Sequence, residues 1–327
     1  MTNDPGRPES ANDDVRTAAR YFQDERGWRL VRLRPRTKQP IGKGWQNAEL
    51  KPADFRPEDN IGIQLGKKSD GLVDIDFDCE QARVLAGLGC FFGHLPAFRR
   101  QSLPPDAPGH RLVLCRDAPD EVTKFAFTRA KEKAAIERLR LPKAVILEVR
   151  AGKAQTAFPP SVLDGDRLVW NAPLGAIPEM TWEDLARRAG LLAFCAVAAC
   201  CYPSEGARND YYLILAGALV HAGIDVEIAE EIIRAIADMN GDEEDRGGMA
   251  RAAAAKEAAR QPVTGLPRFL EVSGLQDCES RLREWLGQKA APPTTSTLPA
   301  NAIDIRNPNI VQRTRLIEDL IFVTGLG

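Results

Sequence analysis

The stretch Leu72-Val73-Asp74-Ile75-Asp76-Phe77-Asp78 alternates apolar residues with carboxylates. Such alternation is typical of a β-strand, in which every second side chain projects from the same face. Three carboxylates on one face repel one another unless water or a cation neutralises them. Two interpretations are open: an edge strand with one hydrated acidic face, or a strand whose acids bind a divalent metal ion. The second is favoured here, because Mg²⁺ prefers one or two carboxylates together with phosphate oxygens.

Polar residues also occur in two predicted strands farther along the chain. His110 and Arg111 open a strand after Pro108-Gly109, and Glu148 lies within the apolar strand 144–150. A charge in an apolar strand costs free energy unless it has a partner. We therefore expect Glu148 to have a function, whereas a single strand histidine is more often structural.

The composition fits a globular protein without a membrane anchor. The chain has 327 residues, of which 44% are hydrophobic and 28% charged, a length that allows two domains. No apolar run approaches the roughly 18–20 residues that cross a bilayer, and the polar, acidic N-terminus lacks the features of a signal peptide. We expect a cytoplasmic protein. The seven cysteines form no CxxC pair and there are only three histidines, so reduced thiols are expected and a structural zinc site is not.

Residues 13–178 are predicted to form an α+β domain. Residues 1–12 are expected to be disordered. Strands are predicted at 28–33, 60–66, 72–77, 110–115, 144–150 and 167–170. Helices are predicted at 15–26, 80–88 and 124–140.

Alanine-rich, helix-periodic sequence then predicts a small all-α bundle over residues 179–287. Its helices are expected at 182–201, 208–222, 225–239 and 242–260. Gly206 and Gly223 mark boundaries, and Asp225 and Asp242 are candidate N-caps. Residues 288–305 have the composition of a linker, and residues 306–327 are expected to begin a further domain.

A basic run between Lys124 and Lys143 carries seven cations against Glu132 and Glu137. A solvated helix face explains such a run, and so does a patch that follows a nucleic-acid backbone. Both interpretations stay open, because the net charge of −2 does not by itself indicate a protein that binds nucleic acid.

The order of a DxD strand, a His-containing strand and an acidic strand resembles the archaeo-eukaryotic primase superfamily. More narrowly, the sequence is similar to the bifunctional primase–polymerase (Prim-Pol) domain of phages, plasmids and mobile elements. The resemblance covers about residues 15–175 and includes Lys38-Gln39-Pro40, NIGIQLG at 60–66 and EVRAGKAQTAFPPS at 148–161. It implies a mixed sheet with an RRM-like core and flanking helices. The helical residues that follow resemble a primase-associated helical domain.

The resemblance also implies roles for individual residues. The two metal-binding acids correspond to Asp76 and Asp78, with Asp74 and Asp76 as an alternative register. The third acid corresponds to Glu148, and His110 corresponds to the histidine that contacts the phosphates of the incoming nucleotide. Further nucleotide contacts are expected from Lys38, Arg111, Arg150 and Gln155. Template contacts are expected from Arg129, Lys131, Lys133, Arg208, Asn209 and Arg246.

Two positions depart from the family pattern. Pro108-Gly109 stands where serine often precedes the histidine, and Leu163 stands where relatives commonly carry histidine. The backbone N–H groups at such a glycine can still meet a phosphate.

The implied activity is that of a DNA primase–polymerase. Such an enzyme makes and extends primers on single-stranded template, using two Mg²⁺ or Mn²⁺ ions and dNTP or NTP substrates. By analogy, a helicase domain is expected beyond the C-terminal residues. Two alternatives remain: a metal-dependent nuclease on the same carboxylates, and a non-catalytic replication-initiation module that binds DNA.

Overall fold

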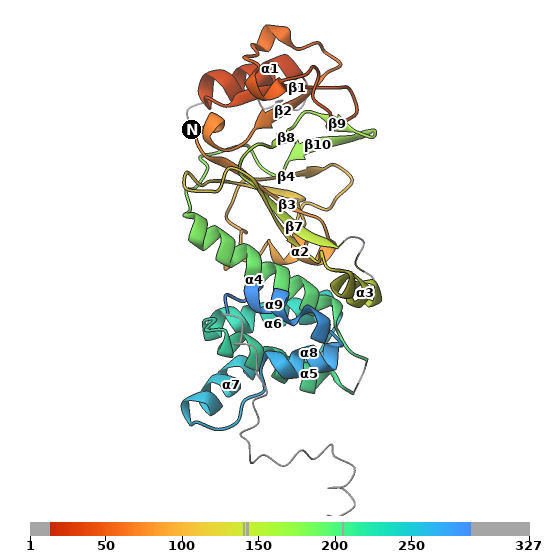
Figure 1. Ribbon diagram of the computed structural model, residues 1–327, viewed down its shortest axis with the longest axis vertical. Coiled ribbons are helices and arrows are strands. Elements are labelled where there is room, and N and C mark those ends of the chain that lie inside the picture. Colours follow the sequence, from red (N-terminus) through yellow and green to blue (C-terminus); the bar gives the residue numbers. More distant parts are fainter. Residues whose placement is uncertain (1–13, 140, 142–143, 205, 289–327) are drawn as a thin grey trace, which may run out of the picture. The chain divides into compact units, whose positions relative to one another are not determined.

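The computed structural model describes residues 14–139, 141, 144–204 and 206–288. Within them the chain forms two antiparallel sheets followed by a group of helices (Figure 1). The segment expected to be disordered, 1–12, and the last predicted segment, 306–327, lie outside the described residues, as does the predicted linker apart from Gln288.

The smaller sheet has the strand order β1-β2-β8. Its strands are β1 (Arg29–Leu33), β2 (Asn60–Gln64) and β8 (Gln155–Ala157). It packs with α1 (Val15–Arg20) and the π-helical turn Tyr21–Glu25 around one apolar core. Large buried aromatic side chains fill this core, namely Phe22, Trp28, Phe55, Phe98 and Phe158.

The acidic strand β3 (Leu72–Phe77) lies inside a seven-stranded sheet of order β6-β7-β3-β5-β4-β10-β9. The other strands are β4 (Ala97–Arg100), β5 (His110–Leu114), β6 (Val122–Ala126), β7 (Val145–Arg150), β9 (Val162–Leu163) and β10 (Asp166–Trp170). Because β5 and β7 both pair with β3, the edge-strand interpretation of the acidic stretch is wrong.

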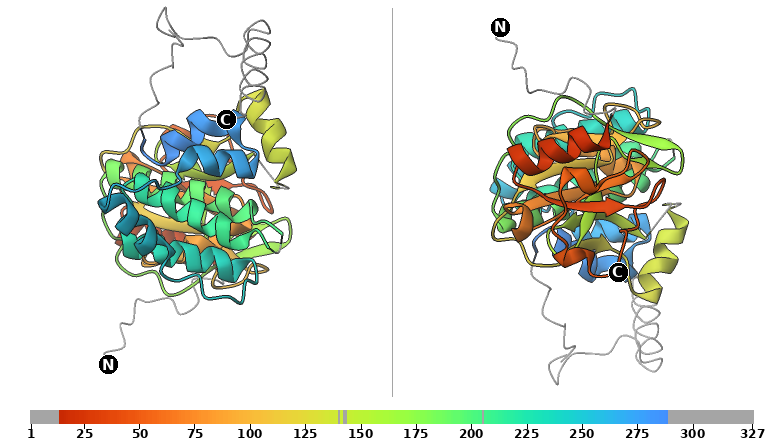
Figure 2. Two further views of the ribbon diagram at one scale, coloured as in Figure 1. Left: turned by 90° about the horizontal axis from the view of Figure 1, so that it is seen from below. Right: turned by 90° about the horizontal axis from the view of Figure 1, so that it is seen from above.

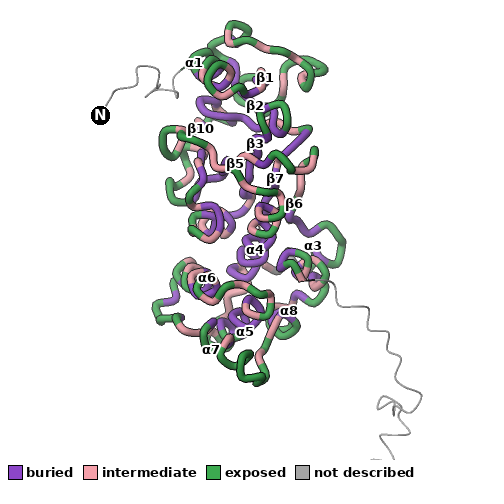
Figure 3. Tube along the Cα trace, turned by 90° about the vertical axis from the view of Figure 1, so that its left-hand side faces the viewer, coloured by how far each residue is buried: buried purple, intermediate pink, exposed green. Residues whose placement is uncertain are grey.

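Helices α2 (Glu80–Leu85) and α4 (Trp182–Cys200) join the large sheet to the helices that follow. α4 is apolar around most of its circumference, a pattern typical of a helix that is buried on all sides. It packs on β6 and β7 and also contacts α6 and α9, so the sheet and the helices share one continuous core. Figure 3 shows the buried trace running through β3 and α4, and Figure 2 shows the helices across one face of the sheet.

The remaining helices are α3 (Ala130–Arg138), α5 (Arg208–His221), α6 (Val226–Met239), α7 (Met249–Ala258), α8 (Leu266–Ser273) and α9 (Glu279–Trp285). The predicted bundle helices at 182–201, 208–222 and 225–239 are confirmed within one or two residues. The Asp225 carboxylate accepts hydrogen bonds from the N–H groups of Glu227 and Ile228, which confirms it as an N-cap.

Two predicted helices need correction. Residues 124–126 belong to β6, whose β-branched and aromatic side chains favour a strand and which pairs with β7. The helix predicted at 242–260 begins only at Met249. Asp242 does not cap it but pairs with Arg246, and Gly248, with φ 84°, stops the helix from extending toward the N-terminus. Strands β4, β8 and β9 were not predicted.

No helix of the described residues is both long and apolar enough to cross a bilayer.

Candidate active site

The three central strands of the large sheet bring the predicted site residues into one row. Asp76 on β3 lies opposite His110 on β5 and opposite Glu148 on β7. Residues in register on neighbouring strands project from the same face. Asp74 and Arg150 form the next pair along β3 and β7 on that face. Residues far apart in sequence therefore meet because β3 is central.

His110 is held on several sides. Its Nδ1 lies 3.1 Å from Asp74 Oδ1 and 3.6 Å from Asp76 Oδ1. The ring stacks on Phe98, with centroids 4.4 Å apart and planes 5° from parallel. An ionised carboxylate only accepts hydrogen bonds, so we assign the Nδ1 proton to the bond with Asp74. This assignment leaves Nε2 as the ring nitrogen that can meet a ligand.

Asp74 is a fully buried carboxylate. Its Oδ2 accepts a hydrogen bond of 2.7 Å from the Thr156 hydroxyl on β8. Burial raises the pKa of the Asp74 carboxyl, but His110, Arg150 and the Thr156 hydroxyl outweigh burial, so this pKa lies below its usual value. Asp74 therefore supplies a fixed negative charge behind the imidazole.

Arg150 bridges two of the acids. Its Nη2 lies 2.6 Å from Asp76 Oδ2 and 2.8 Å from Glu148 Oε2, while Lys124 Nζ lies 2.6 Å from Glu148 Oε1. Burial lowers the pKa of Arg150, but Asp76, Asp74 and Glu148 together raise it above its usual value. Burial raises the pKa of Glu148, and Lys124 and Arg150 reverse this, so the carboxyl is more acidic than usual.

A cavity of about 310 Å³ opens beside this row. The carboxylates of Asp76 and Asp78 line it, together with His110 and the glycine before it, Gly109. The basic residues that line it are Lys38, Arg83, Arg100 and Arg150. A cavity with paired acids and several cations fits a ligand that carries both phosphates and a divalent metal ion.

The donor set fits a hard divalent ion in part. Asp76 and Asp78 offer adjacent carboxylates at the cavity, and Mg²⁺ is commonly held by one or two carboxylates plus phosphate oxygens. A complete site of three protein donors is not preformed: within the described residues, no three His, Cys, Asp or Glu side chains are grouped closely enough. Glu148 does not line the cavity, because Lys124 and Arg150 hold its oxygens.

Two predicted nucleotide contacts lie elsewhere. Arg111 follows His110 on β5, so its side chain projects from the opposite face of the sheet, where Nη1 donates to the carbonyls of Gly93 and Leu95. Gln155 does not line the cavity. Its Nε2 donates a 2.8 Å hydrogen bond to the Lys38 carbonyl and so supports the segment that carries Lys38.

The predicted template contacts divide into buried and exposed residues. Arg246 is only 3% exposed and bonds to Asp242 and Glu244, so we remove it from the template candidates. Arg208 lies 4.0 Å from Asp242 beside the Tyr202 ring, and Asn209 is exposed. Arg129, Lys131 and Lys133 are exposed at the start of α3.

Sequence reasoning missed Arg83, Arg100, Phe98 and Thr156. Arg83 lies on the helix that directly follows the acidic strand, a position that could have indicated a phosphate contact. Thr156 lies on β8, a strand that was not predicted. Arg100 and Phe98 lie on β4, a strand that was not predicted.

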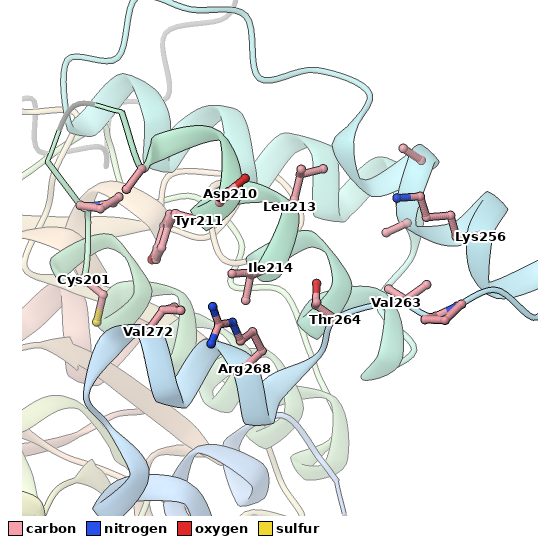
Figure 4. Close-up of a pocket in the computed structure, with 15 residues that line it drawn as sticks. Cys201, Asp210, Tyr211, Leu213, Ile214, Lys256, Val263, Thr264, Arg268 and Val272 are labelled. Atoms are coloured by element: carbon pink, nitrogen blue, oxygen red, sulfur yellow. The ribbon is translucent and has the colours of Figure 1, made fainter. Parts of the chain in front are cut away.

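A larger cavity, of about 580 Å³, lies among α5, α7 and α8 (Figure 4). Its walls include Leu213, Ile214 and Val272, and Asp210 is the single carboxylate among the described residues that line it. This cavity lacks paired acids. The smaller cavity beside Asp76 is therefore the better candidate for metal-assisted chemistry.

The sheet region corresponds to a known family. The family model described as bifunctional DNA primase/polymerase, N-terminal, matches residues 18–181. The chain belongs to this family. The match contains both sheets and the Asp76–His110–Glu148 row, and the helices from α4 onward follow it, which confirms the predicted fold class. No curated protein matches the chain.

Proposed function

We propose that this Prim-Pol chain is a DNA primase–polymerase that adds nucleotides to a 3′-hydroxyl on single-stranded template. The observation that carries the proposal is the cavity in which Asp76 and Asp78 meet His110 and four cationic side chains. A nucleoside triphosphate with bound Mg²⁺ or Mn²⁺ has the complementary charge pattern. Family membership supports the same class of reaction.

Asp76 and Asp78 would hold the divalent ions, either Mg²⁺ or Mn²⁺. Bound there, such ions activate the attacking hydroxyl and neutralise charge on the phosphates. Lys38, Arg83 and Arg100 would bind the triphosphate, and His110, with both ring nitrogens protonated, would donate from Nε2 to a phosphate oxygen. Most of the catalysis would come from positioning and charge stabilisation.

The burial of Asp74 supports the register Asp76/Asp78 over Asp74/Asp76. Asp74 is fully buried, and it bonds His110 and Thr156 instead of lining the cavity. A carboxylate used in this way positions the imidazole. The alternative register would require a metal ion to displace both of these partners.

Glu148 would act mainly through Arg150. Its bonds to Lys124 and Arg150 place the guanidinium beside Asp76 and at the wall of the cavity. Glu148 would join Asp76 as a third metal ligand only where a bound ion displaces Arg150. We retain this role as part of the proposal. An origin in a phage, plasmid or other mobile element is proposed from the resemblance alone.

Primer synthesis provides the test. Wild type, Asp76→Asn/Asp78→Asn and the control Asp238→Asn, which changes an exposed residue on α6, are incubated with single-stranded DNA, nucleotides and Mn²⁺ or Mg²⁺. We expect labelled products from wild type and control, with and without a primer, and none from the double variant. Equal products from all three proteins, or none from wild type, would refute the proposal. Metal-dependent shortening of the DNA instead would favour the nuclease.

A further inference from the structure

A third cavity lies on the face of the large sheet opposite the acidic row. It measures about 540 Å³, and Arg111 lines it together with His94, Asp106 and Asn171. Because neighbouring side chains on a strand alternate, His110 and Arg111 serve different cavities. We call this cavity the Arg111 pocket. Its volume falls within the several hundred Å³ that are usual for small-molecule sites.

Arg111 is a buried cation that has no carboxylate partner among the residues the structure describes. The residue is 6% exposed, and within the described residues its only hydrogen bonds run from Nη1 to the carbonyls of Gly93 and Leu95, at 3.2 and 3.1 Å. Nε has no partner in that part of the chain. Burial alone lowers the pKa of Arg111, to about 10, with no acid opposing it. An uncompensated buried charge is costly.

The surroundings of the pocket are also rich in cations. Burial lowers the pKa of His94, and the positive charges of Arg188 and Arg111 lower it further, which places both arginines near this imidazole. Among the described residues, Arg188 likewise bonds only to backbone carbonyls, those of Cys90 and Phe91. Asp106, at the exposed rim, is the one carboxylate among the described residues that line the pocket.

Two other arginines differ. Half-buried Arg150 and buried Arg246 each lie against carboxylates of the protein itself, so their charges are compensated within the fold. Arg111 keeps unused N–H donors at a cavity wall, where a ligand can supply the missing negative charge. A phosphate group matches such donors, because guanidinium and phosphate form short, charge-assisted hydrogen bonds.

We propose that the Arg111 pocket binds the phosphate group of a small molecule, either free phosphate or a nucleotide. Arg111 would donate to the phosphate, with the His94 imidazole and the Asn171 amide at the rim. This binding goes beyond the proposed nucleotidyl transfer and uses the other face of the sheet. Phosphate binding in the Arg111 pocket therefore does not depend on the acids Asp76 and Asp78, so this proposal and the proposed nucleotidyl transfer are tested separately.

The three histidines provide a local test, since His94, His110 and His221 are the only ones in the chain. Their imidazole NMR signals are followed while orthophosphate, and separately dATP, is added in EDTA at fixed pH and ionic strength. We expect a saturable shift of the His94 signal. Arg111→Met should weaken this binding by roughly tenfold or more, because it removes the charge-assisted bonds.

Arg99→Met is the matched control. Arg99 also donates from Nη1 to backbone carbonyls, and its Nε has no partner in the part of the chain that the structure describes. It does not line the pocket, so its loss should leave binding unchanged. Asp106→Asn provides a second test in case Arg111→Met does not fold, because Asp106 is exposed and its change should leave folding intact. It should tighten binding a few-fold, since it removes a repelling charge.

Each outcome is decisive. Tighter binding of dATP than of orthophosphate at His94 supports the proposal with a nucleotide as ligand, and equal binding supports it with phosphate alone. A His94 signal that does not move overturns the proposal. The proposal is also overturned if Arg111→Met binds as tightly as wild type. The same holds if Asp106→Asn binds no more tightly than wild type. A dATP shift confined to His110 would place the ligand in the acidic cavity and also overturn it.

Discussion

The His110 imidazole and the Asp74 carboxylate form a buried pair, with Nδ1 3.1 Å from Oδ1, behind the cavity that Asp76 and Asp78 line. The Phe98 ring stacks on the imidazole and the Thr156 hydroxyl bonds the carboxylate. Side chains from three strands, β3, β4 and β8, therefore fix the orientation of one ring on β5. A carboxylate that holds a histidine in this way fixes Nδ1 as a hydrogen-bond donor.

Asp74→Asn should slow primer extension without weakening metal binding. The amide keeps the shape of the carboxylate but loses its charge. It can also present an N–H to Nδ1, so the imidazole is no longer held with Nδ1 as the hydrogen-bond donor. Loss of such an orienting partner typically costs about 10–100-fold in activity. Extension rates and Mn²⁺ titration of the same protein measure the two effects separately.

Thr156→Val serves as the milder companion of Asp74→Asn, because it removes one bond to Asp74 and leaves the charge in place. We expect a smaller loss of extension rate. Unchanged extension by Asp74→Asn would contradict the positioning role. Loss of Mn²⁺ affinity would instead identify Asp74 as a metal ligand and support the alternative register.

The exposed cations of α3 should contribute to binding of single-stranded DNA. Arg129, Lys131 and Lys133 are all exposed, in contrast to Arg246. If all three contact phosphates, their joint change to Gln should weaken binding and reduce the slope of log K against log salt by about 2. Fluorescence anisotropy across a salt series measures this slope.

The control for that experiment changes three exposed cations in the N-terminal half, Lys51, Arg56 and Lys67, to Gln. Equal losses of affinity in the two triple variants would show that net charge alone matters. In that case the solvated-face interpretation of the basic run would hold.

The alternation of β3 could be predicted from sequence because apolar and acidic residues strictly alternate there. The same rule could have separated His110 from Arg111, since adjacent strand residues face opposite sides. It could likewise have placed Glu148 beside Arg150, two residues apart on β7. Each of these relationships joins residues close together in one strand, so the sequence alone indicates it.

Other features depend on contacts between distant segments. The burial of Arg246 depends on its place over the ring of Tyr212, which lies on the separate helix α5, a contact that no local pattern indicates. The segment that forms β6 includes the charged residue Lys124. This segment is a strand because it pairs with β7, which lies farther along the chain. The four cations of the acidic cavity come from four separate segments, so only the folded chain brings them together.

The cysteine thiols should be unreactive in the folded protein. Burial, with Glu231 nearby, raises the pKa of Cys90 from 9.0 to about 12, and burial likewise raises the pKa of Cys79 to about 11. A rise of this size for Cys90 lowers the thiolate fraction at pH 8 roughly a thousandfold. Mass spectrometry after iodoacetamide treatment should find Cys90 unmodified in native protein and fully modified in urea. Rapid native labelling at pH 8 would contradict the raised pKa.

Gly217→Ala should destabilise the helical region. Gly217 lies on α5, and a Cβ added there would approach the Thr264 carbonyl oxygen to 1.7 Å, so the segment before α8 would have to move away. Such overpacking costs about 1–3 kcal/mol, more than the helix propensity that alanine gains over glycine, about 1 kcal/mol. Gly89→Ala is the control, because a Cβ at Gly89 meets nothing within 4 Å. Urea unfolding should give a lower midpoint for Gly217→Ala alone, and equal midpoints would show that the Thr264 segment yields freely.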